Sequence, residues 1–457
     1  MYNNDTIAAV ATAQGVGGVA IVRISGTNAP DILCGIFKQA GKPSAFKDRV
    51  MYYGHVTDGG EIIDEALAVM MYAPRSFTRE NVAEIHIHGG VITTERTLTA
   101  ALKHGARLAE PGEFLRRAFE NGRVDLAQAE SSLQLIEAQS ETAARSALAA
   151  LSGGLSSYIT RVKSSLIAIR AAIEAAIDFP DEIDETTTAS EVSDKLNQIR
   201  LDLLSNCDPN AGRIIEDGLN VVIAGLPNAG KSALMNALLR RERSIVHETA
   251  GTTRDILTET LRIDGVTLRL SDTAGLRSPM EPAEPIETIG VELAKKCAKR
   301  ADLVLYVIDS AKPADGRDID NLASLTNYLV ILNKIDQPQC VRPGAFSNAD
   351  VRDVLQVSAA TGEGVAELSQ ELSHRARTIC VEPKLITNAR HIEAARNAQS
   401  FIEDALETLN NKGLFGEALT LALIDISAAH NALSQITGES ATENVINEIF
   451  SRFCVGK

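Results

Sequence analysis

The feature that most constrains the fold is a glycine-rich segment, Gly-Leu-Pro-Asn-Ala-Gly-Lys-Ser at 225–232, which fits the pattern G-x-x-x-x-G-K-S. It follows an apolar run of β type at 219–224 and precedes a stretch of helical character. In this context the N–H groups of the loop and of the helix N-terminus can cradle phosphates, Lys231 can reach the terminal phosphates, and the Ser232 hydroxyl can bind Mg²⁺. A chance glycine-rich turn is the alternative, and further motifs in the expected order weaken it.

Three more motifs each follow a predicted strand. In Asp272-Thr273-Ala274-Gly275, Asp272 can act on Mg²⁺ through water and the Gly275 N–H can face a γ-phosphate. In Asn333-Lys334-Ile335-Asp336, the Asp336 carboxylate can accept hydrogen bonds from guanine N1–H and the 2-amino group, donors that adenine lacks. Ser358-Ala359-Ala360 would support the guanine O6 from its backbone. Together the motifs predict a GTPase whose nucleotide-binding residues are Asn228, Ala229, Gly230, Lys231, Ser232, Ala233, Asp272, Thr273, Ala274, Gly275, Asn333, Lys334, Asp336, Ser358, Ala359 and Ala360.

The segment Gly251-Thr252-Thr253-Arg254-Asp255 lies where a switch loop belongs, and Thr253 is the natural second hydroxyl on Mg²⁺ beside Ser232. A plain Gly-Thr turn is the alternative. Leu276 follows the second motif, and its apolar side chain cannot orient the attacking water as a Gln does. Glu287 is therefore the predicted catalytic group, with a surface carboxylate as the alternative, and Arg277 or a bound monovalent cation could stabilise the transferring phosphoryl group.

The order of predicted elements indicates an α/β fold combined with an all-α part. Short β-type runs up to about residue 120 predict a small α/β domain, and the alternation between about 215 and 380 predicts a parallel sheet with helices on both faces. The stretch 125–177 predicts two long helices with one break, at Gly153-Gly154, and the chain is helical again after Pro383. The expected domains are 1–120, a helical domain split into 121–215 and 381–457, and an inserted nucleotide-binding domain at 216–380.

Net charge, apolar content and cysteine distribution exclude several classes of protein. The chain has 457 residues and a formal net charge of -15, which disfavours a protein that coats nucleic acid by bulk charge. No window reaches the roughly 18 apolar residues of a membrane span, and nothing resembles a signal peptide, so a cytoplasmic protein without membrane contact is expected. The six cysteines are scattered and predict reduced thiols.

Several segments outside the GTPase motifs carry a resemblance to a known family. They are Asp5-Thr6-Ile7-Ala8-Ala9, Gly17 to Gly26, Pro111-Gly112-Glu113-Phe114 with Arg117-Ala118-Phe119, Asp125 to Glu130, and the tail Cys454-Val455-Gly456-Lys457. With these segments the chain resembles the MnmE (TrmE) family, GTPases of tRNA wobble-uridine modification, over essentially its whole length. The resemblance implies an N-terminal folate-binding domain that dimerises, a split helical domain and an inserted Ras-like G domain.

The resemblance also implies an activity and its site residues. It implies K⁺-dependent GTP hydrolysis and, with the FAD-containing partner MnmG, addition of an aminomethyl or carboxymethylaminomethyl group to C5 of uridine 34 of certain tRNAs. The one-carbon donor would be 5,10-methylene- or 5-formyl-tetrahydrofolate. By matching position, the K⁺ ligands would be Asn228, His247, Thr249 and Thr252, the folate contacts Arg23, Glu80, Arg123 and Lys457, and the tail cysteine with a role in the modification Cys454.

A ribosome-assembly or translation-associated GTPase is the alternative function. The related switch proteins of that class end in a KH module, and Gly413-Leu414-Phe415-Gly416 formally satisfies the G-x-x-G of that module. The loop lacks basic residues and no KH strand set is evident around it, so a turn between two helices is the preferred interpretation.

Overall fold

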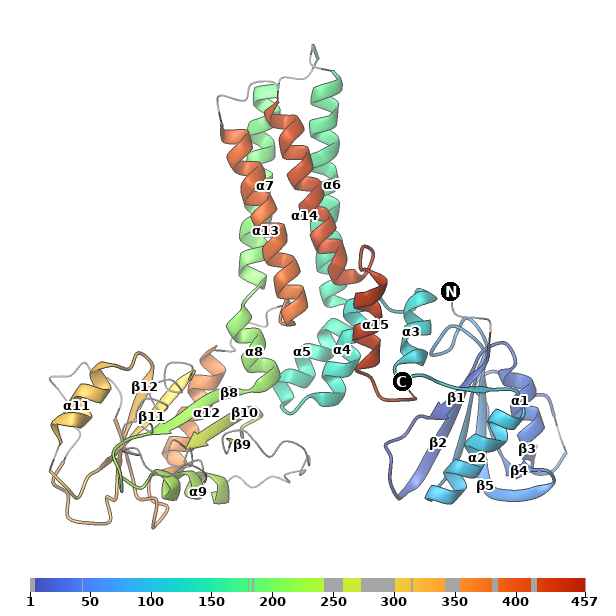
Figure 1. Ribbon diagram of the computed structural model, residues 1–457, viewed down its shortest axis with the longest axis horizontal. Coiled ribbons are helices and arrows are strands. Elements are labelled where there is room, and N and C mark those ends of the chain that lie inside the picture. Colours follow the sequence, from blue (N-terminus) through green and yellow to red (C-terminus); the bar gives the residue numbers. More distant parts are fainter. Residues whose placement is uncertain are drawn as a thin grey trace, which may run out of the picture. The chain divides into compact units, whose positions relative to one another are not determined.

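The protein forms two compact units in a computed structural model (Figure 1). The model describes residues 5–42, 44–179, 181–182, 185–241, 258–272, 301–313, 315–341, 354–379, 385–411 and 417–456. The first unit comprises Met1–Leu133, Leu148–Arg200 and Ala394–Lys457, and the second comprises Gln134–Ala147 and Leu201–Glu393. The predicted division at 120, 215 and 380 is finer than these two units and stays a prediction.

A seven-stranded sheet in the order β3-β4-β5-β6-β2-β1-β7 organises the N-terminal part of the first unit. All neighbours are antiparallel except β1 and β7. Alternate residues of the strands pack with α1 and α2 in one apolar core, as expected for a sheet with one buried face. The elements are β1 (Ile7–Val10), β2 (Gly17–Ser25), α1 (Ala29–Ile36), β3 (Phe37–Gln39), β4 (Met51–Asp58), β5 (Glu61–Met71), β6 (Val82–Gly89), α2 (Val91–Lys103) and β7 (Arg107–Leu108).

Helix α3 (Glu113–Glu120) joins this sheet to the C-terminal helix α15 (Glu443–Ser451). Leu115 and Ala118 of α3 pack in one apolar cluster with Phe450 and Phe453. Gly112, at the start of α3, has a φ of 68°, and a Cβ there would overlap the carbonyl oxygen of Phe450. The two segments, more than 300 residues apart in the sequence, are therefore packed at backbone contact.

The helical part contains one more break than the sequence predicts. Instead of two long helices over 125–177, there are three: α4 (Leu126–Glu137), α5 (Glu141–Leu151) and α6 (Gly154–Asp178). The predicted break at Gly153 is present, and the missed one lies at 138–140. There the Ser140 hydroxyl accepts a hydrogen bond from the Ala143 N–H at 3.0 Å, which favours a helix start over continuation. The remaining long helices are α7 (Glu185–Asn206), α13 (Ala389–Asn410) and α14 (Ala418–Thr437), of which α14 packs along α6.

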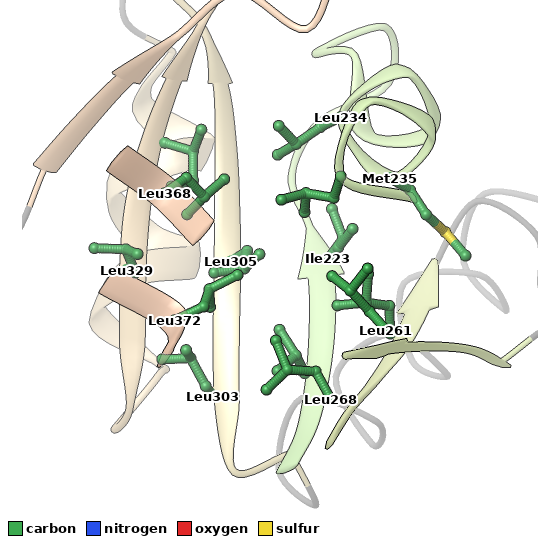
Figure 2. Close-up of a cluster of buried hydrophobic side chains, with 14 of the residues drawn as sticks. Ile223, Leu234, Met235, Leu261, Leu268, Leu303, Leu305, Leu329, Leu368 and Leu372 are labelled. Carbon is green, nitrogen blue, oxygen red and sulfur yellow. The ribbon is translucent and has the colours of Figure 1, made fainter. Parts of the chain in front are cut away.

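The second unit contains a six-stranded sheet in the order β13-β12-β11-β8-β10-β9, parallel except for the edge strand β9. Helices α9 and α12 cover one face with a leucine-rich core (Figure 2), and α11 packs on the other. Both faces are buried, which explains the continuous apolar runs of the strands. The elements are α8 (Pro209–Asp217), β8 (Leu219–Ala224), α9 (Lys231–Arg241), β9 (Thr258–Ile263), β10 (Val266–Asp272), β11 (Leu303–Asp309), α11 (Gly316–Ala323), β12 (Tyr328–Asn333), β13 (Val354–Val357) and α12 (Val365–Ile379).

Strand β9 was not predicted. A signal for it exists, because Asp264-Gly265 joins β9 to β10 and both residues have positive φ, 48° and 82°. An Asp-Gly pair between two short β-type runs is typical of a tight hairpin.

Two other expectations concern the described residues alone. Among them no helix is long and apolar enough to span a membrane. Cys34, Cys207, Cys340 and Cys454 are reduced thiols, as predicted.

Candidate nucleotide and folate sites

The predicted nucleotide-binding motifs meet at one edge of the parallel sheet. The P-loop follows β8, Asp272 ends β10, Asn333 ends β12, and Ser358 follows β13. The carboxyl ends of parallel strands share an edge, and ligands of such sheets bind there. Motifs that begin as far apart in the sequence as Gly225 and Ser358 are thus brought together by the strand order.

The P-loop has the conformation of a phosphate cradle. Gly225, Asn228 and Gly230 have φ values of 141°, 63° and 96°, and left-handed residues of this kind are typical of loops whose backbone N–H groups bind anions. Lys231 is buried, and its ammonium donates to the carbonyl oxygens of Gly225 and Leu226, both at 2.9 Å. Helix α9 begins at this lysine, so the N–H groups of its first turn lie at the loop.

Side chains connect the three loops of the base-recognition region. Asn333, only 1% exposed, donates from Nδ2 to the Ala229 carbonyl at 2.9 Å and accepts from the Ala359 N–H at 3.0 Å. The buried Ser358 hydroxyl donates to Asp336 Oδ1 at 2.6 Å, so the carboxylate predicted to read guanine is held in place. Ser358 was expected to act through its backbone, and this side-chain contact is an addition.

Asp309, at the end of β11, is a site residue that the sequence analysis missed. Its Oδ2 accepts from Lys334 Nζ at 2.6 Å, and the same ammonium donates to the carbonyl oxygen of Asn228 at 2.9 Å. Asp309 thereby holds the lysine of the base loop against the P-loop. The sequence does contain a signal for this residue, because Asp309 is an acidic residue at the end of an apolar strand. That strand, β11, pairs with β12, which ends in the Asn-Lys-x-Asp motif.

Several predicted residues lie outside the described part of the chain. They are His247, Thr249, Thr252, Thr253, Thr273, Ala274, Gly275, Glu287 and Lys457, together with the formal KH loop 413–416. The backbone of Asp272 is described as the last residue of β10. The described residues beyond 385 form three helices and no strand pair of a KH module.

A second group of predicted residues gathers around Phe77 in the first unit. The guanidinium carbons of Arg23 and Arg123 lie 4.8 Å and 4.7 Å from the centre of the Phe77 ring. Burial, and then the positive charges of Arg23 and Arg79, lower the pKa of Arg123. Arg23 also pairs with Glu84 at 2.8 Å. The positive charges of Arg23 and Arg123 are thus close together, and a nearby anion would stabilise both.

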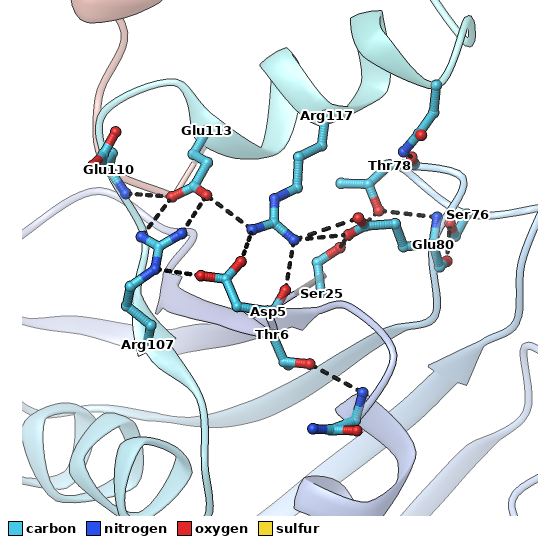
Figure 3. Close-up of polar contacts among 12 residues, drawn as sticks. Asp5, Thr6, Ser25, Ser76, Thr78, Glu80, Arg107, Glu110, Glu113 and Arg117 are labelled. Carbon is cyan, nitrogen blue, oxygen red and sulfur yellow. Dashed lines mark hydrogen bonds and ion pairs between the residues drawn. The ribbon is translucent and has the colours of Figure 1, made fainter. Parts of the chain in front are cut away.

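Glu80 belongs to the same loop as Phe77. Its carboxylate accepts from Ser25 Oγ at 2.7 Å and lies 3.3 Å from Arg117 (Figure 3). Three of the four predicted folate contacts, Arg23, Glu80 and Arg123, are therefore on or against one loop, residues 76–80.

The C-terminal tail is docked, although the sequence suggests a mobile end. Val455 forms an antiparallel bridge with Pro111, and the Gly112 N–H donates to the Cys454 carbonyl at 3.4 Å. Gly456 is buried with a φ of 100°, and its carbonyl lies 3.5 Å from Arg23 Nη1. Cys454 itself is exposed. Backbone pairing with the segment before α3, which sequence patterns do not report, is what orders the tail.

Family models and full-length relatives match this chain over both parts described above, the N-terminal part and the part that contains the nucleotide motifs. The family model described as "MnmE helical domain" matches residues 126–454, and "GTP-binding protein TrmE N-terminus" matches residues 6–123. The tRNA modification GTPase MnmE of Lactococcus lactis subsp. cremoris (strain SK11) is 40% identical over 466 residues, which cover 99% of this chain and 98% of that protein. The protein of the same name from Thermoanaerobacter sp. (strain X514) is 39% identical and covers 99% of both chains.

Among solved structures, the G domain of the FeoB iron transporter of T. maritima is 25% identical, with a TM-score of 0.26 and coverage of 35% of this chain and 98% of that chain. The full-length relatives and the two family models together span nearly every residue. The chain belongs to the MnmE family of tRNA modification GTPases.

Proposed function

We propose that the protein is a K⁺-dependent GTPase that acts in the modification of wobble uridine in tRNA. The observation that carries the GTPase part is the junction of the P-loop with the Asn333 and Ser358 loops at one sheet edge. In this proposal Asp336 accepts hydrogen bonds from guanine, the N–H groups of the P-loop bind the phosphates, and Lys231 moves from the loop carbonyls to the terminal phosphates.

Two cations complete the proposed nucleotide site. Mg²⁺ would be held by the hydroxyls of Ser232 and Thr253, and Ser232 is exposed on the first turn of α9, where such a ligand is needed. K⁺ would be held by Asn228 with His247, Thr249 and Thr252. A bound cation stabilises charge on the transferring phosphoryl group, and Glu287 would orient the attacking water.

For the modification reaction we propose a tetrahydrofolate site at the loop 76–80. The clustered guanidinium groups of Arg23 and Arg123 suit the carboxylates of a folate, and the Glu80 carboxylate suits the N–H donors of its reduced pterin. Lys457 and Cys454 would approach from the tail. The supplied one-carbon unit would become part of the aminomethyl or carboxymethylaminomethyl group on C5 of uridine 34.

The proposed assembly and location follow the family. The N-terminal domain, residues 1–120, would form a homodimer, and the FAD-containing MnmG would be the partner in the reaction. The helical segments 121–215 and 381–457 would flank the G domain, 216–380. A protein with tRNA as its substrate is expected in the cytoplasm.

Two measurements test the proposal. Mass spectrometry of tRNA nucleosides from cells that lack the protein should show loss of the modified uridine, whereas a ribosome-assembly GTPase would leave it at normal levels. Purified protein should hydrolyse GTP faster in KCl than in NaCl or choline chloride, and the Asn228→Ala variant should respond less to K⁺. Equal rates in the three salts would refute the cation site.

A further inference from the structure

The buried network behind Glu80 is centred on Arg117 of α3, whose side chain is 3% exposed (Figure 3). Its guanidinium donates to the carboxylate of Asp5 at 2.7 Å, to the backbone carbonyl of Asp5 at 2.9 Å and to Glu113 at 2.9 Å. The Nη1 atom of Arg117 also lies 3.3 Å and 3.4 Å from the two carboxylate oxygens of Glu80. The hydrogen bonds to Asp5 and Glu113 thus place the Arg117 guanidinium beside the Glu80 carboxylate.

A second donor reaches the carboxylate of Glu80 from β2. The Ser25 hydroxyl, fully buried, donates to Glu80 Oε2 at 2.7 Å and also contacts the Thr78 hydroxyl at 2.7 Å. The Glu80 N–H donates to Thr78 Oγ1 at 3.2 Å, so the backbone of the residue is held as well. The Glu80 side chain nevertheless remains 27% exposed.

The supporting carboxylates are themselves fixed. Arg107 pairs with Asp5 at 2.8 Å and with Glu113 at 2.7 Å. Burial alone would lower the pKa of Arg117, but the negative charges of Glu80, Glu113 and Asp5 raise it. The cation is therefore stable at its buried position, and a network in which Asp5 and Glu113 are each held by two guanidinium groups has little freedom to move.

We propose that Arg117, together with Ser25, is a positioning residue that holds the Glu80 carboxylate in one orientation toward a ligand with paired N–H donors, such as the reduced pterin of a tetrahydrofolate. The inference rests on the proposed folate site. Preorganised acceptors bind more tightly because the ligand does not have to order them. Arg117 Nη1 faces both oxygens of Glu80 while Nη2 donates to Asp5 and Glu113, an arrangement that the single ammonium of a lysine cannot reproduce.

Calorimetric titration of the full chain with 5-formyl-tetrahydrofolate tests the proposal in four variants. Glu80→Gln should weaken binding by about 10-fold or more, Arg117→Lys by about 10-fold and Ser25→Ala by about 5-fold, as expected when a charged hydrogen bond is lost or loosened. Arg116→Lys is the matched control, since Arg116 is the next residue in the sequence but its guanidinium pairs with Glu120 rather than Glu80. It should bind as the wild type does.

The decisive result is the coupling with Glu80. In the Glu80→Gln background, Arg117→Lys and Ser25→Ala should each weaken binding by less than about 2-fold further, because the oriented acceptor is already gone. Equal losses of affinity in the wild-type and Glu80→Gln backgrounds would indicate general damage to the protein. That result would overturn the inference about Arg117 and Ser25 but leave the proposed folate site standing. If Arg117→Lys does not fold, judged by its thermal unfolding, the Ser25→Ala cycle decides by the same criterion. Absence of binding to the wild type would overturn the folate site and the inference with it.

Discussion

Lys334 and Asn228 both occupy the left-handed backbone region, with φ values of 69° and 63°. For residues other than glycine this conformation costs on the order of 1 kcal/mol each and persists only where surrounding contacts impose it. Here the two residues contact each other, since the Lys334 ammonium donates to the Asn228 carbonyl. The same ammonium also donates to the Asp309 carboxylate, which holds it in place. The conformation of the nucleotide site therefore depends on a residue that belongs to neither recognised motif.

Asp309→Asn should weaken GDP binding by about 10-fold, because a neutral amide holds the Lys334 ammonium less firmly than a carboxylate does. Preference for guanine over adenine should remain, since Asp336 is unchanged. Titration calorimetry with GDP and ADP measures both effects. Asp315→Asn is the control, because Asp315 caps α11 and Asn caps helices equally well. An unchanged affinity in Asp309→Asn would show that the lysine needs no such support.

Glu113 provides a test of the buried network by pH. Burial alone would raise its pKa, but hydrogen bonds from Arg107, the Glu110 N–H and Arg117 lower the pKa below its usual 4.5. The folded state then binds protons less readily than the unfolded state, so this contribution to stability is present above about pH 4.5 and is lost as the pH falls below it.

Glu113→Gln should therefore lower the melting temperature at pH 7. As the pH falls below about 5, the melting temperature of the variant should decrease less steeply than that of the wild type. The free energy of unfolding should fall by about 3 kcal/mol at neutral pH, since the buried guanidinium of Arg117 loses a carboxylate. The loss at Arg107, whose side chain is 39% exposed, adds little. Calorimetry or circular dichroism follows the transition. Glu120→Gln, on the same helix but more exposed, is the control and should change little. Parallel pH curves for wild type and Glu113→Gln would contradict the prediction.

At the scale of elements, short chain segments acquire order from backbone contacts with remote partners. Val455 pairs with Pro111 and Gly112 packs on Phe450, so the tail and the start of α3 support each other. Gly456 is the tightest point, because a Cβ there would overlap the carbonyl oxygen of Val10 and its φ of 100° disfavours any other residue.

Gly456→Ala should displace the last residues of the tail from β1 and Arg23. Uridine modification should fall strongly, whereas GTP hydrolysis should stay near the wild-type rate, since the nucleotide motifs all lie elsewhere in the chain. Nucleoside mass spectrometry of tRNA and a phosphate-release assay give the two results. Val455→Ala, at an exposed neighbour, is the control. Normal modification with Gly456→Ala would argue against a role of the docked tail.

At the scale of the whole molecule, the chain leaves the second unit close to where it enters. Cys207 forms a parallel bridge with Ile386, and Gly212 packs against the backbone of Thr387. An inserted unit whose ends meet loses little when it is cut from its host. A cut at residue 201 removes the segment 134–147 of this unit, including the hydrogen bond from the Thr267 hydroxyl to the Gln139 carbonyl at 3.2 Å and the Glu141 side chain beside Gly265.

A fragment of residues 201–393 should therefore fold alone and bind GDP within about 3-fold of the full chain. Its stability should be lower by about 1 kcal/mol or more, since the Thr267–Gln139 hydrogen bond and the packing of Glu141 are both lost. Circular dichroism melting with and without GDP tests folding and binding together. A fragment without a cooperative transition, even with GDP, would show that the segment 134–147 is required for the unit to fold.

The local chemistry of the protein could be predicted from its sequence. The strand before the P-loop, Leu219–Ala224, has the predicted bounds. The motif from Asn333 to Asp336 lies at the end of β12, one residue nearer to the strand than expected. Predictions of such features hold because apolar periodicity and motif spacing depend only on residues that are close together in the sequence. Family segments outside the G domain, such as the tail, then indicated which family the chain belongs to.

Other features depend on which remote segments pack together. The Asp309–Lys334 pair, the Arg117–Glu80 contact and the docking of Gly456 on Val10 join residues between 25 and 446 positions apart. The break at Ser140 was missed for a related reason, since helical spacing on both sides hides a side-chain cap. No periodicity encodes such contacts, because they arise only when strand order and helix packing bring buried polar groups within hydrogen-bonding distance.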